Sequence, residues 1–321
     1  MAKLKLMPRI SIIIPVGIPD DNFYECIEHC RNLDYTNYEI IVLPDEALKL
    51  DVPGIRTIPT GHTDPSTKRN IGIDSAEGEI CAFIDSDAFP IRNWLSIAAA
   101  SFWSKEIAAV GGPNLTPDDD SPMQQANGII FSSLLGGRRY KVRYNRVTEL
   151  DGWELQTVNM LARKSVLKKL NGFQVGLWPG EDAKLSFQIS DILKMKQLYI
   201  PKLIVYHHRR KLFRPYLSQV WRSGITKGTL IKDFFSLRRL EYFIPSLFVV
   251  GLFLGPVLLP FSVIIRVSYL LILGVYILGA LFTGMRTGNL KIGASVFIGI
   301  ILTHLTYGVA FLSGLLRRGS V

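Results

Sequence analysis

The chain has 321 residues, a formal net charge of +10 and a mean hydropathy of +0.23. Its length allows one large domain or two, and its hydropathy excludes an ordinary soluble protein. The apolar excess is concentrated in three C-terminal runs without any Asp, Glu, Lys or Arg: residues 244–265, 267–285 and 292–316. Each run is near the length needed to cross a bilayer. We therefore expect a multi-pass protein of the cell membrane, with a large domain before the apolar runs.

The domain that precedes the apolar runs is expected on the cytoplasmic side of the membrane. The N-terminal residues MAKLKLMPRI contain no apolar core of a signal peptide. The cysteines Cys26, Cys30 and Cys81 form no CxxC pair and no disulfide framework, as is typical of a reducing compartment. Cys26 and Cys30 are spaced to share one face of a helix, where we expect them to be small core residues.

Positive charge gathers directly before the first apolar run. Ten Lys or Arg residues and two acidic residues lie between Lys202 and Glu241. Anionic head groups attract such juxtamembrane segments, so we expect anionic membrane lipids as partners. A second basic cluster, from Arg138 to Arg146, is predicted to lie in a loop. Basic clusters are also typical of nucleic-acid-binding proteins, but the membrane anchor makes this the poorer explanation, and we expect no nucleic acid.

The region before residue 233 reads as alternating strands and helices. Residues 10–16 (ISIIIPV) form a continuous β-branched run, which predicts a strand buried on both faces. Asp20 or Asp21 can cap the helix that follows. Further strands are predicted at residues 39–43, 55–58, 80–84, 108–112 and 198–206, and further helices around residues 68–72, 93–102, 165–170 and 182–193. This alternation indicates an α/β fold with a mostly parallel sheet.

The segment Asp85-Ser-Asp87 directly follows the predicted buried strand at residues 80–84. Two carboxylates one residue apart suit a hard divalent cation that already carries phosphate oxygens. Ligands of open α/β sheets also bind at the carboxyl ends of the strands. An Asp-x-Asp alone is a weak signal, because it often marks a solvated turn. Its setting among the other motifs strengthens it.

Residues 9–225 resemble the family 2 glycosyltransferases of the GT-A fold. Six segments occur in the order of that family: SIIIPV at residues 11–16, Leu43-Pro-Asp45, Lys68-Arg-Asn-Ile-Gly72, Asp85-Ser-Asp87, Asn171-Gly-Phe173 with Gly180-Glu181-Asp182, and Val205-Tyr-His207. The resemblance implies a Rossmann-like GT-A domain over residues 1–233, followed by a juxtamembrane segment and three apolar helices over residues 234–321.

The same resemblance implies a role for each site residue. The donor, a nucleotide-sugar, is expected to contact the residues Pro15, Val16, Asp45, Arg69 and Asp85. Asp45 stands alone where the family usually has two acidic residues.

The expected cofactor is Mn²⁺ or Mg²⁺, bound directly by Asp87 and His207. Imidazole is a softer ligand than carboxylate, which slightly favours Mn²⁺. An alternative for His207 is a histidine in a basic surface stretch. Asp182 is the expected general base, and Glu181 is expected to orient the loop or the acceptor. The alternative for this pair is a simple acidic helix start.

Trp178 and Arg222 are expected to contact the acceptor or the diphosphate. Processive polysaccharide synthases of this family carry Gln-x-x-Arg-Trp. Gln219 and Arg222 are present here, but Ser223 stands in place of the Trp. This difference argues against an enzyme that extrudes a polymer.

The expected function is the inverting transfer of a single sugar from a nucleotide-sugar to a lipid-linked acceptor, such as a polyprenyl-diphosphate saccharide. A polysaccharide synthase, a polyprenyl-phosphate glycosyltransferase and an inactive GT-A membrane scaffold are the alternatives. We expect three membrane spans, because each run is long enough to cross, and these would place the C-terminus across the membrane from the catalytic domain. Pro256 and Pro260 could instead break the first run into a re-entrant helix, which would return the C-terminus to the cytosol.

Overall fold

The computed structural model describes residues 7–50, 52–145, 150–151 and 154–317. The chain divides into two compact units, which we call the sheet unit and the helical unit. The sheet unit consists of residues 1–115 and 145–208, and the helical unit of residues 116–144 and 209–321. Residues 116–144 interrupt the sheet unit in the sequence but belong to the same unit as the C-terminal region. The domain boundary expected between residues 233 and 234 stays a prediction.

The sheet unit is built on an eight-stranded sheet with the order β3-β2-β1-β4-β9-β6-β10-β8. Its strands are β1 (Ile10–Pro15), β2 (Tyr38–Leu43), β3 (Ile55–Thr57), β4 (Ile80–Phe83), β6 (Ile107–Gly111), β8 (Leu150–Asp151), β9 (Met160–Arg163) and β10 (Lys196–Tyr199). Strands β3, β2, β1 and β4 pair in parallel, as do β6 and β10. Strand β9 is antiparallel to both β4 and β6, and β8 is antiparallel to β10. The mostly parallel α/β fold predicted from the sequence is confirmed.

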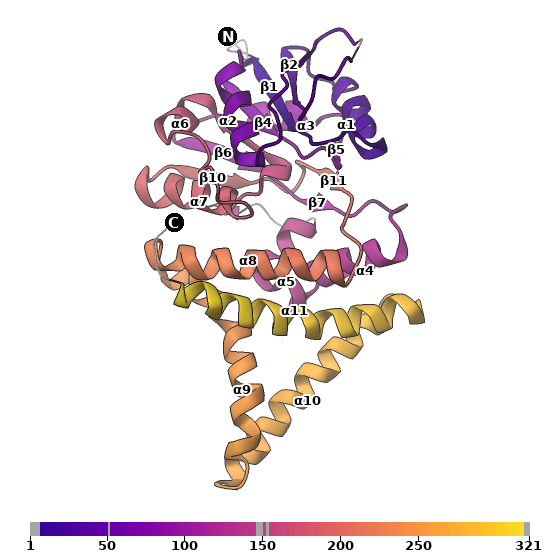
Figure 1. Cartoon of the computed structure of the whole chain (residues 1–321), viewed down its shortest axis with the longest axis vertical. Helices are drawn as coiled ribbons and strands as arrows, with labels where there is room; N and C mark the ends of the chain where they lie inside the picture. Colours follow the sequence, from indigo (N-terminus) through magenta and orange to yellow (C-terminus); the bar gives the residue numbers. More distant parts are fainter. Residues whose placement is uncertain (1–6, 51, 146–149, 152–153, 318–321) are drawn as a thin grey trace, which may run out of the picture. The chain divides into compact units, whose positions relative to one another are not determined.

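Helices accompany this sheet (Figure 1). They are α1 (Asp21–Arg31), α2 (Pro65–Ser75), α3 (Trp94–Ser101), α6 (Lys164–Lys169) and α7 (Glu181–Phe187), the last continued by a π-helical turn at Gln188–Ile192. Asp20 caps α1 as expected, because its carboxylate accepts a hydrogen bond from Phe23 N at 3.0 Å. All six residues of β1 are buried, and Cys26 and Cys30 lie in the same core.

A small second sheet lies in the same unit, with the order β5-β11-β7. Its strands are β5 (Ala88–Pro90), β7 (Asn114–Leu115) and β11 (Val205–His207). The single strand expected over residues 198–206 is therefore wrong. Strand β10 ends at Tyr199, a turn at Pro201 and Lys202 follows, and β11 joins the other sheet. Proline has no N–H to continue a ladder, which accounts for the break.

Helix α2 is tied to the loop before α7 through Asn70. Its amide donates to Phe173 O at 2.8 Å, and Phe173 N donates to the Asn70 side-chain oxygen at 2.7 Å. The side chain thus pairs with the backbone of Phe173 as a neighbouring strand would. Gly172, with a φ of +73°, makes the turn that presents Phe173.

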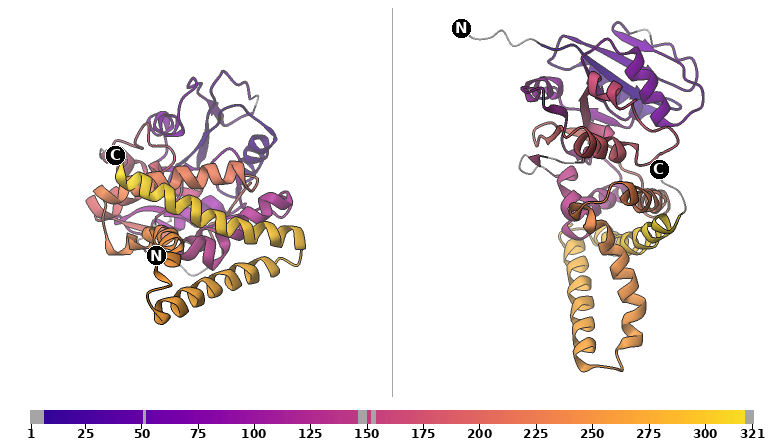
Figure 2. Two further views of the ribbon diagram at one scale, coloured as in Figure 1. Left: turned by 60° about the horizontal axis from the view of Figure 1, so that its bottom comes forward. Right: turned by 90° about the vertical axis from the view of Figure 1, so that its left-hand side faces the viewer.

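The helical unit contains α4 (Pro122–Ser132), α5 (Leu134–Gly137), α8 (Arg214–Asp233), α9 (Ile244–Leu258), α10 (Val263–Met285) and α11 (Leu290–Leu316). Within this unit α11 packs along α8, while α9 and α10 form a hairpin that extends away from them (Figures 1 and 2). Three segments are long and apolar enough to cross a membrane: Leu237–Leu258, Val263–Met285 and Leu290–Leu316. Three apolar segments were expected, and these confirm them.

The basic cluster from Arg138 to Arg146 is not a loop as expected. The 3₁₀-helix Arg138–Tyr144 contains its first part, where Arg143 stacks over the ring of Tyr140. Arg146 lies outside the described residues.

We predict that Gly172→Ala destabilises the protein more than Gly176→Ala. Both glycines have a positive φ, so both substitutions carry the same backbone strain of about 1–2 kcal/mol. A Cβ at Gly172 would lie 2.2 Å from the Asn70 side-chain oxygen, whereas a Cβ at Gly176 meets nothing within 4 Å. The clash should cost about 1–3 kcal/mol more, as for a lost buried hydrogen bond. Thermal unfolding of the two variants in detergent, followed by tryptophan fluorescence, measures the difference. Equal losses would show that the Asn70–Phe173 contact contributes nothing.

Candidate active site

Asp85, Asp87 and His207 converge at the edge of the sheet unit. The two aspartates follow β4 and lead into β5, and His207 ends β11. Because β11 pairs with β5, His207 lies opposite Ala88, and its Nε2 is 3.2 Å from Asp87 Oδ1. One ligand atom from each of the three residues lies within 4.8 Å of the others. The structure therefore brings together the two expected metal ligands and adds Asp85 to them.

These three side chains fit a divalent cation that binds oxygen and nitrogen ligands. The Asp87 side chain is 46% exposed, and those of Asp85 and His207 are 31% and 19% exposed. A cation held here would keep open positions for the phosphate oxygens of a ligand. Carboxylate oxygens with one imidazole suit Mn²⁺ well and Mg²⁺ less well.

A buried guanidinium connects this cluster to the start of α7. Arg69 donates from Nη2 to Asp85 Oδ1 at 2.8 Å and from Nη1 to Glu181 Oε1 at 2.7 Å. Burial opposes its charge, but Asp85 and Glu181 more than offset this and raise the pKa of Arg69. Among the described residues its Nε has no hydrogen-bond partner. Arg69 therefore acts as a fixed internal cation that connects two carboxylates.

Glu181 and Asp182 form the first turn of α7, so the simple helix-start interpretation is correct for their local structure. Glu181 is buried, and its second oxygen accepts from Gly180 N at 2.9 Å. Burial raises the pKa of Glu181 to about 7, Arg69 opposes this rise, and Asp182 adds to it. The charge of Glu181 thus depends on Arg69. Asp182 is half-buried and accepts from Ala183 N at 2.7 Å, which fixes its carboxylate.

Lys68, to which the sequence analysis gave no role, organises the ends of β1 and β2. Its buried ammonium donates to Val16 O at 2.6 Å, to Leu43 O at 3.2 Å and to the carboxylate of Asp45. His62 Nδ1 lies 2.8 Å from the other Asp45 oxygen. The hydrogen bond from Lys68 is the main cause that lowers the pKa of Asp45, so this residue remains a carboxylate. The sequence feature that could have pointed to a role for Lys68 is its position one helical turn after Asp64, the residue that caps α2.

The remaining predicted residues lie in both units. Pro15 and Val16 are at the end of β1, next to Asp45 through the Val16 N to Leu43 O hydrogen bond of 3.1 Å. Trp178 precedes α7 and is 41% exposed. Arg222 lies on α8 of the helical unit. All other predicted site residues belong to the sheet unit.

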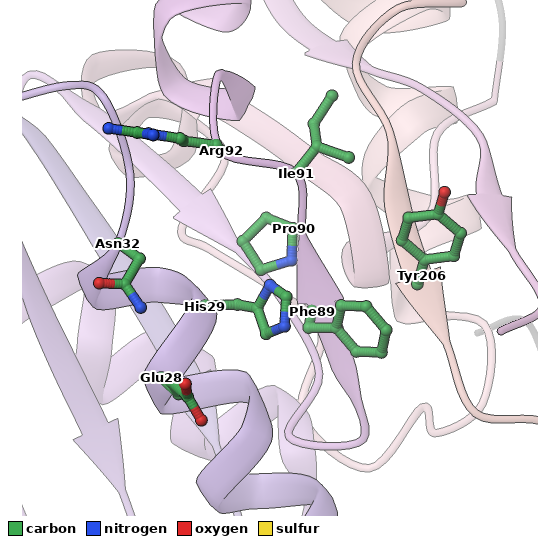
Figure 3. A pocket seen from close by; sticks show the side chains of 8 residues that line it. All are labelled: Glu28, His29, Asn32, Phe89, Pro90, Ile91, Arg92 and Tyr206. Carbon is green, nitrogen blue, oxygen red and sulfur yellow. The ribbon is translucent and has the colours of Figure 1, made fainter. Parts of the chain in front are cut away.

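A separate pocket of about 350 Å³ lies beside β5 and β11 (Figure 3). Its wall contains stacked rings: the centroid of Phe89 is 5.3 Å from that of Tyr206 and 4.6 Å from that of His29. Successive side chains of a strand alternate between faces, so Phe89 and Tyr206 face away from His207. This pocket contains none of the predicted site residues.

Comparisons with known proteins identify the family of the chain. Residues 11–170 match the family model described as Glycosyl transferase family 2. The chain is 24% identical over 256 residues to glycosyltransferase AglE of Haloferax volcanii, an alignment that covers 73% of this chain and 78% of that protein. It is 34% identical over 152 residues to an uncharacterized glycosyltransferase of Haemophilus influenzae, which covers 42% of this chain and 60% of that protein.

A solved structure shares the fold of nearly the whole chain. It is the mannosyltransferase PcManGT from Pyrobaculum calidifontis, in complex with GDP-Man and Mn²⁺. The TM-score is 0.61 at 16% identity, over 93% of this chain and 87% of that one. Together with the matched family model, this shows that the chain belongs to glycosyltransferase family 2, with a GT-A domain and long apolar C-terminal helices.

Proposed function

We propose that this glycosyltransferase moves a single sugar, with inversion, from a nucleotide-sugar to a saccharide carried on polyprenyl diphosphate. The observation that carries this proposal is the link made by Arg69. It joins Asp85 of the metal-ligand cluster to Glu181, the residue before the expected base. This link supports a single site for the motifs assigned to the donor and to the acceptor.

The donor nucleotide is assigned to the carboxyl ends of β1 and β2. Asp45, held as a carboxylate by Lys68, can accept hydrogen bonds from a base. Pro15 and Val16 provide backbone beside it. A GDP-Man ligand in the structural relative makes GDP-mannose the first donor to test.

The diphosphate is assigned to the cluster of Asp85, Asp87 and His207. A divalent cation there would stabilise the charge on the departing diphosphate. Asp87 and His207 would hold the cation. Asp85, whose Oδ1 accepts from Arg69, is assigned to the ribose or to a metal-bound water.

Asp182 is assigned as the base that accepts the proton of the incoming hydroxyl. A carboxylate within hydrogen-bond reach of that hydroxyl can remove its proton as the new C–O bond forms. Glu181 is held by Arg69 and Gly180 N, so it positions the loop rather than taking the proton. One displacement by the hydroxyl inverts the anomeric centre.

The apolar helices support a lipid-linked acceptor. Three segments suited to a membrane follow a strongly basic stretch that anionic lipids attract. A diphosphate carrier presents its saccharide at the membrane surface, beside those basic side chains. The exposed ring of Trp178 and the guanidinium of Arg222 are assigned to the acceptor or its diphosphate.

Product analysis tests the proposed acceptor. The purified protein in lipid, with GDP-mannose and other nucleotide-sugars and a lipid extract, should yield one added sugar per lipid-linked saccharide. NMR of the product should show an inverted anomeric configuration relative to the donor. A polymer, or a sugar on polyprenyl phosphate itself, would overturn the acceptor assignment.

Metal binding tests the cluster directly. Asp87→Asn and His207→Ala should each weaken Mn²⁺ binding by more than the roughly 10–100-fold that loss of an outer-shell partner costs. Electron paramagnetic resonance of free Mn²⁺, in titrations with a nucleoside diphosphate present, measures this. Asp119→Asn, at an exposed carboxylate of the helical unit, is the matched control. Full turnover of the unaltered enzyme in excess EDTA would exclude the proposed metal.

Substitution of Asp182 separates chemistry from donor binding. Asp182→Asn should lower kcat by roughly 10²-fold or more, the usual scale for a lost general base, and leave donor affinity nearly unchanged. Asp74→Asn changes an exposed carboxylate on α2 and serves as control. An equal loss of donor binding would assign Asp182 to the nucleotide pocket instead.

A further inference from the structure

We propose that α11 lies along the membrane surface and does not cross the bilayer, although its length and composition allow a span. The α9–α10 hairpin is then the part that enters the membrane and returns. The chain after α11 lies on the same side of the membrane as the sheet unit. This differs from the three-span topology expected from the apolar runs alone.

The first observation is that α11 runs side by side with α8 in the same direction. Near the start of α8 and the middle of α11, the hydroxyls of Tyr216 and Thr303 are 2.6 Å apart. At their ends, Lys232 Nζ donates to Arg317 O at 2.7 Å. The second contact lies further along both helices than the first, so the helices run in parallel. At 1.5 Å per residue, they lie side by side for about 20 Å.

Glycines bring the two backbones into contact between these points. A Cβ at Gly228 would lie 2.2 Å from Phe311 O, and one at Gly314 would lie 2.1 Å from Ile225 O. Gly224 and Gly228 are four residues apart on α8, the spacing that allows close helix packing. The backbones of α8 and α11 therefore pack directly against each other at these glycines.

The second observation is the charge of α8. Arg214, Arg222, Lys227 and Lys232 are distributed along its whole length. Charged side chains are costly at the centre of a bilayer. If α11 crossed the bilayer with this contact intact, α8 would enter beside it and carry Arg222 and Lys227 into the hydrocarbon. A crossing α11 would have to break the glycine contacts first.

The third observation is the face of α11 opposite its packing partners. Seven apolar residues at intervals of three or four form a stripe on it: Ala294, Ile298, Ile301, Leu305, Val309, Leu312 and Leu316. These residues are exposed or half-buried. The packed pair of helices thus has an apolar face on α11 and basic side chains on α8, and this combination holds helices in the membrane interface with the apolar face in the acyl chains. We assign the lipid bilayer as the partner of this stripe.

The hairpin supports the same topology. α10 is exposed along much of its length, and its exposed side chains are apolar except for Arg266 and Ser268 near its start. Gly255 of α9 approaches the ring of Tyr269 on α10, where a Cβ would lie 2.1 Å from a ring carbon. Arg266 donates to Leu259 O beside the turn that joins the helices. The lipid contact of this hairpin continues into the stripe of α11, because α10 leads directly into it.

Accessibility of single cysteines to a membrane-impermeant maleimide tests the topology. The native cysteines Cys26, Cys30 and Cys81 are buried. The full-length variant Ser320→Cys should be labelled from the same side of sealed vesicles as Lys105→Cys of the sheet unit. Labelling of Ser320→Cys only from the opposite side, or only after detergent is added, would overturn the proposal.

Spin labels measure the depth of α11 independently. Ile298→Cys, Leu305→Cys and Leu312→Cys, each labelled in full-length protein in lipid vesicles, should report similar shallow depths by oxygen and nickel accessibility. Leu271→Cys and Leu278→Cys on α10 should report different depths, as positions along a crossing helix do. A depth profile on α11 that is deepest at Leu305 would show a spanning helix and overturn the proposal, even if one variant folded poorly.

Discussion

The buried guanidinium of Arg69, placed between Asp85 and Glu181, is the contact on which the active site depends. Glu181 is buried too, so without this cation its charge would be uncompensated in a poorly solvated interior. Removing one partner of a buried ion pair costs about 3–5 kcal/mol. The pair therefore stabilises the site only as a complete unit. This explains why Arg69, although its side chain is buried, belongs to the site.

Arg69 is one of three consecutive residues of α2 whose side chains connect different parts of the site. Successive residues of a helix point about 100° apart, so Lys68, Arg69 and Asn70 reach three different parts of the unit. Lys68 joins the ends of β1 and β2, Arg69 joins the two acidic motifs, and Asn70 pairs with Phe173. One helical turn thus fixes the regions assigned to nucleotide, diphosphate and acceptor relative to one another.

Sequence reasoning succeeded where a local pattern carries the information. Asp20 as a cap and the buried run of β1 are examples. It failed for β9, whose four residues Met160–Arg163 are too short to show a periodicity, although the strand lies in the middle of the sheet. The role of Lys68 was also hidden. A buried lysine and a surface lysine look alike in a sequence, and only the tertiary structure shows three acceptors around its ammonium.

The same limit applies to the apolar helices. Hydropathy measures what a segment could do alone in lipid, and on that measure α11 resembles α10. The two helices differ in their neighbours. α10 itself has a largely exposed, mostly apolar surface. α11 instead packs closely, through glycines, against the positively charged helix α8. Two helices packed this closely must lie in the same environment. Inserting α11 into the bilayer would therefore also carry the energetic cost of inserting the charged side chains of α8. Membrane topology in such a chain is therefore decided by packing as well as by composition.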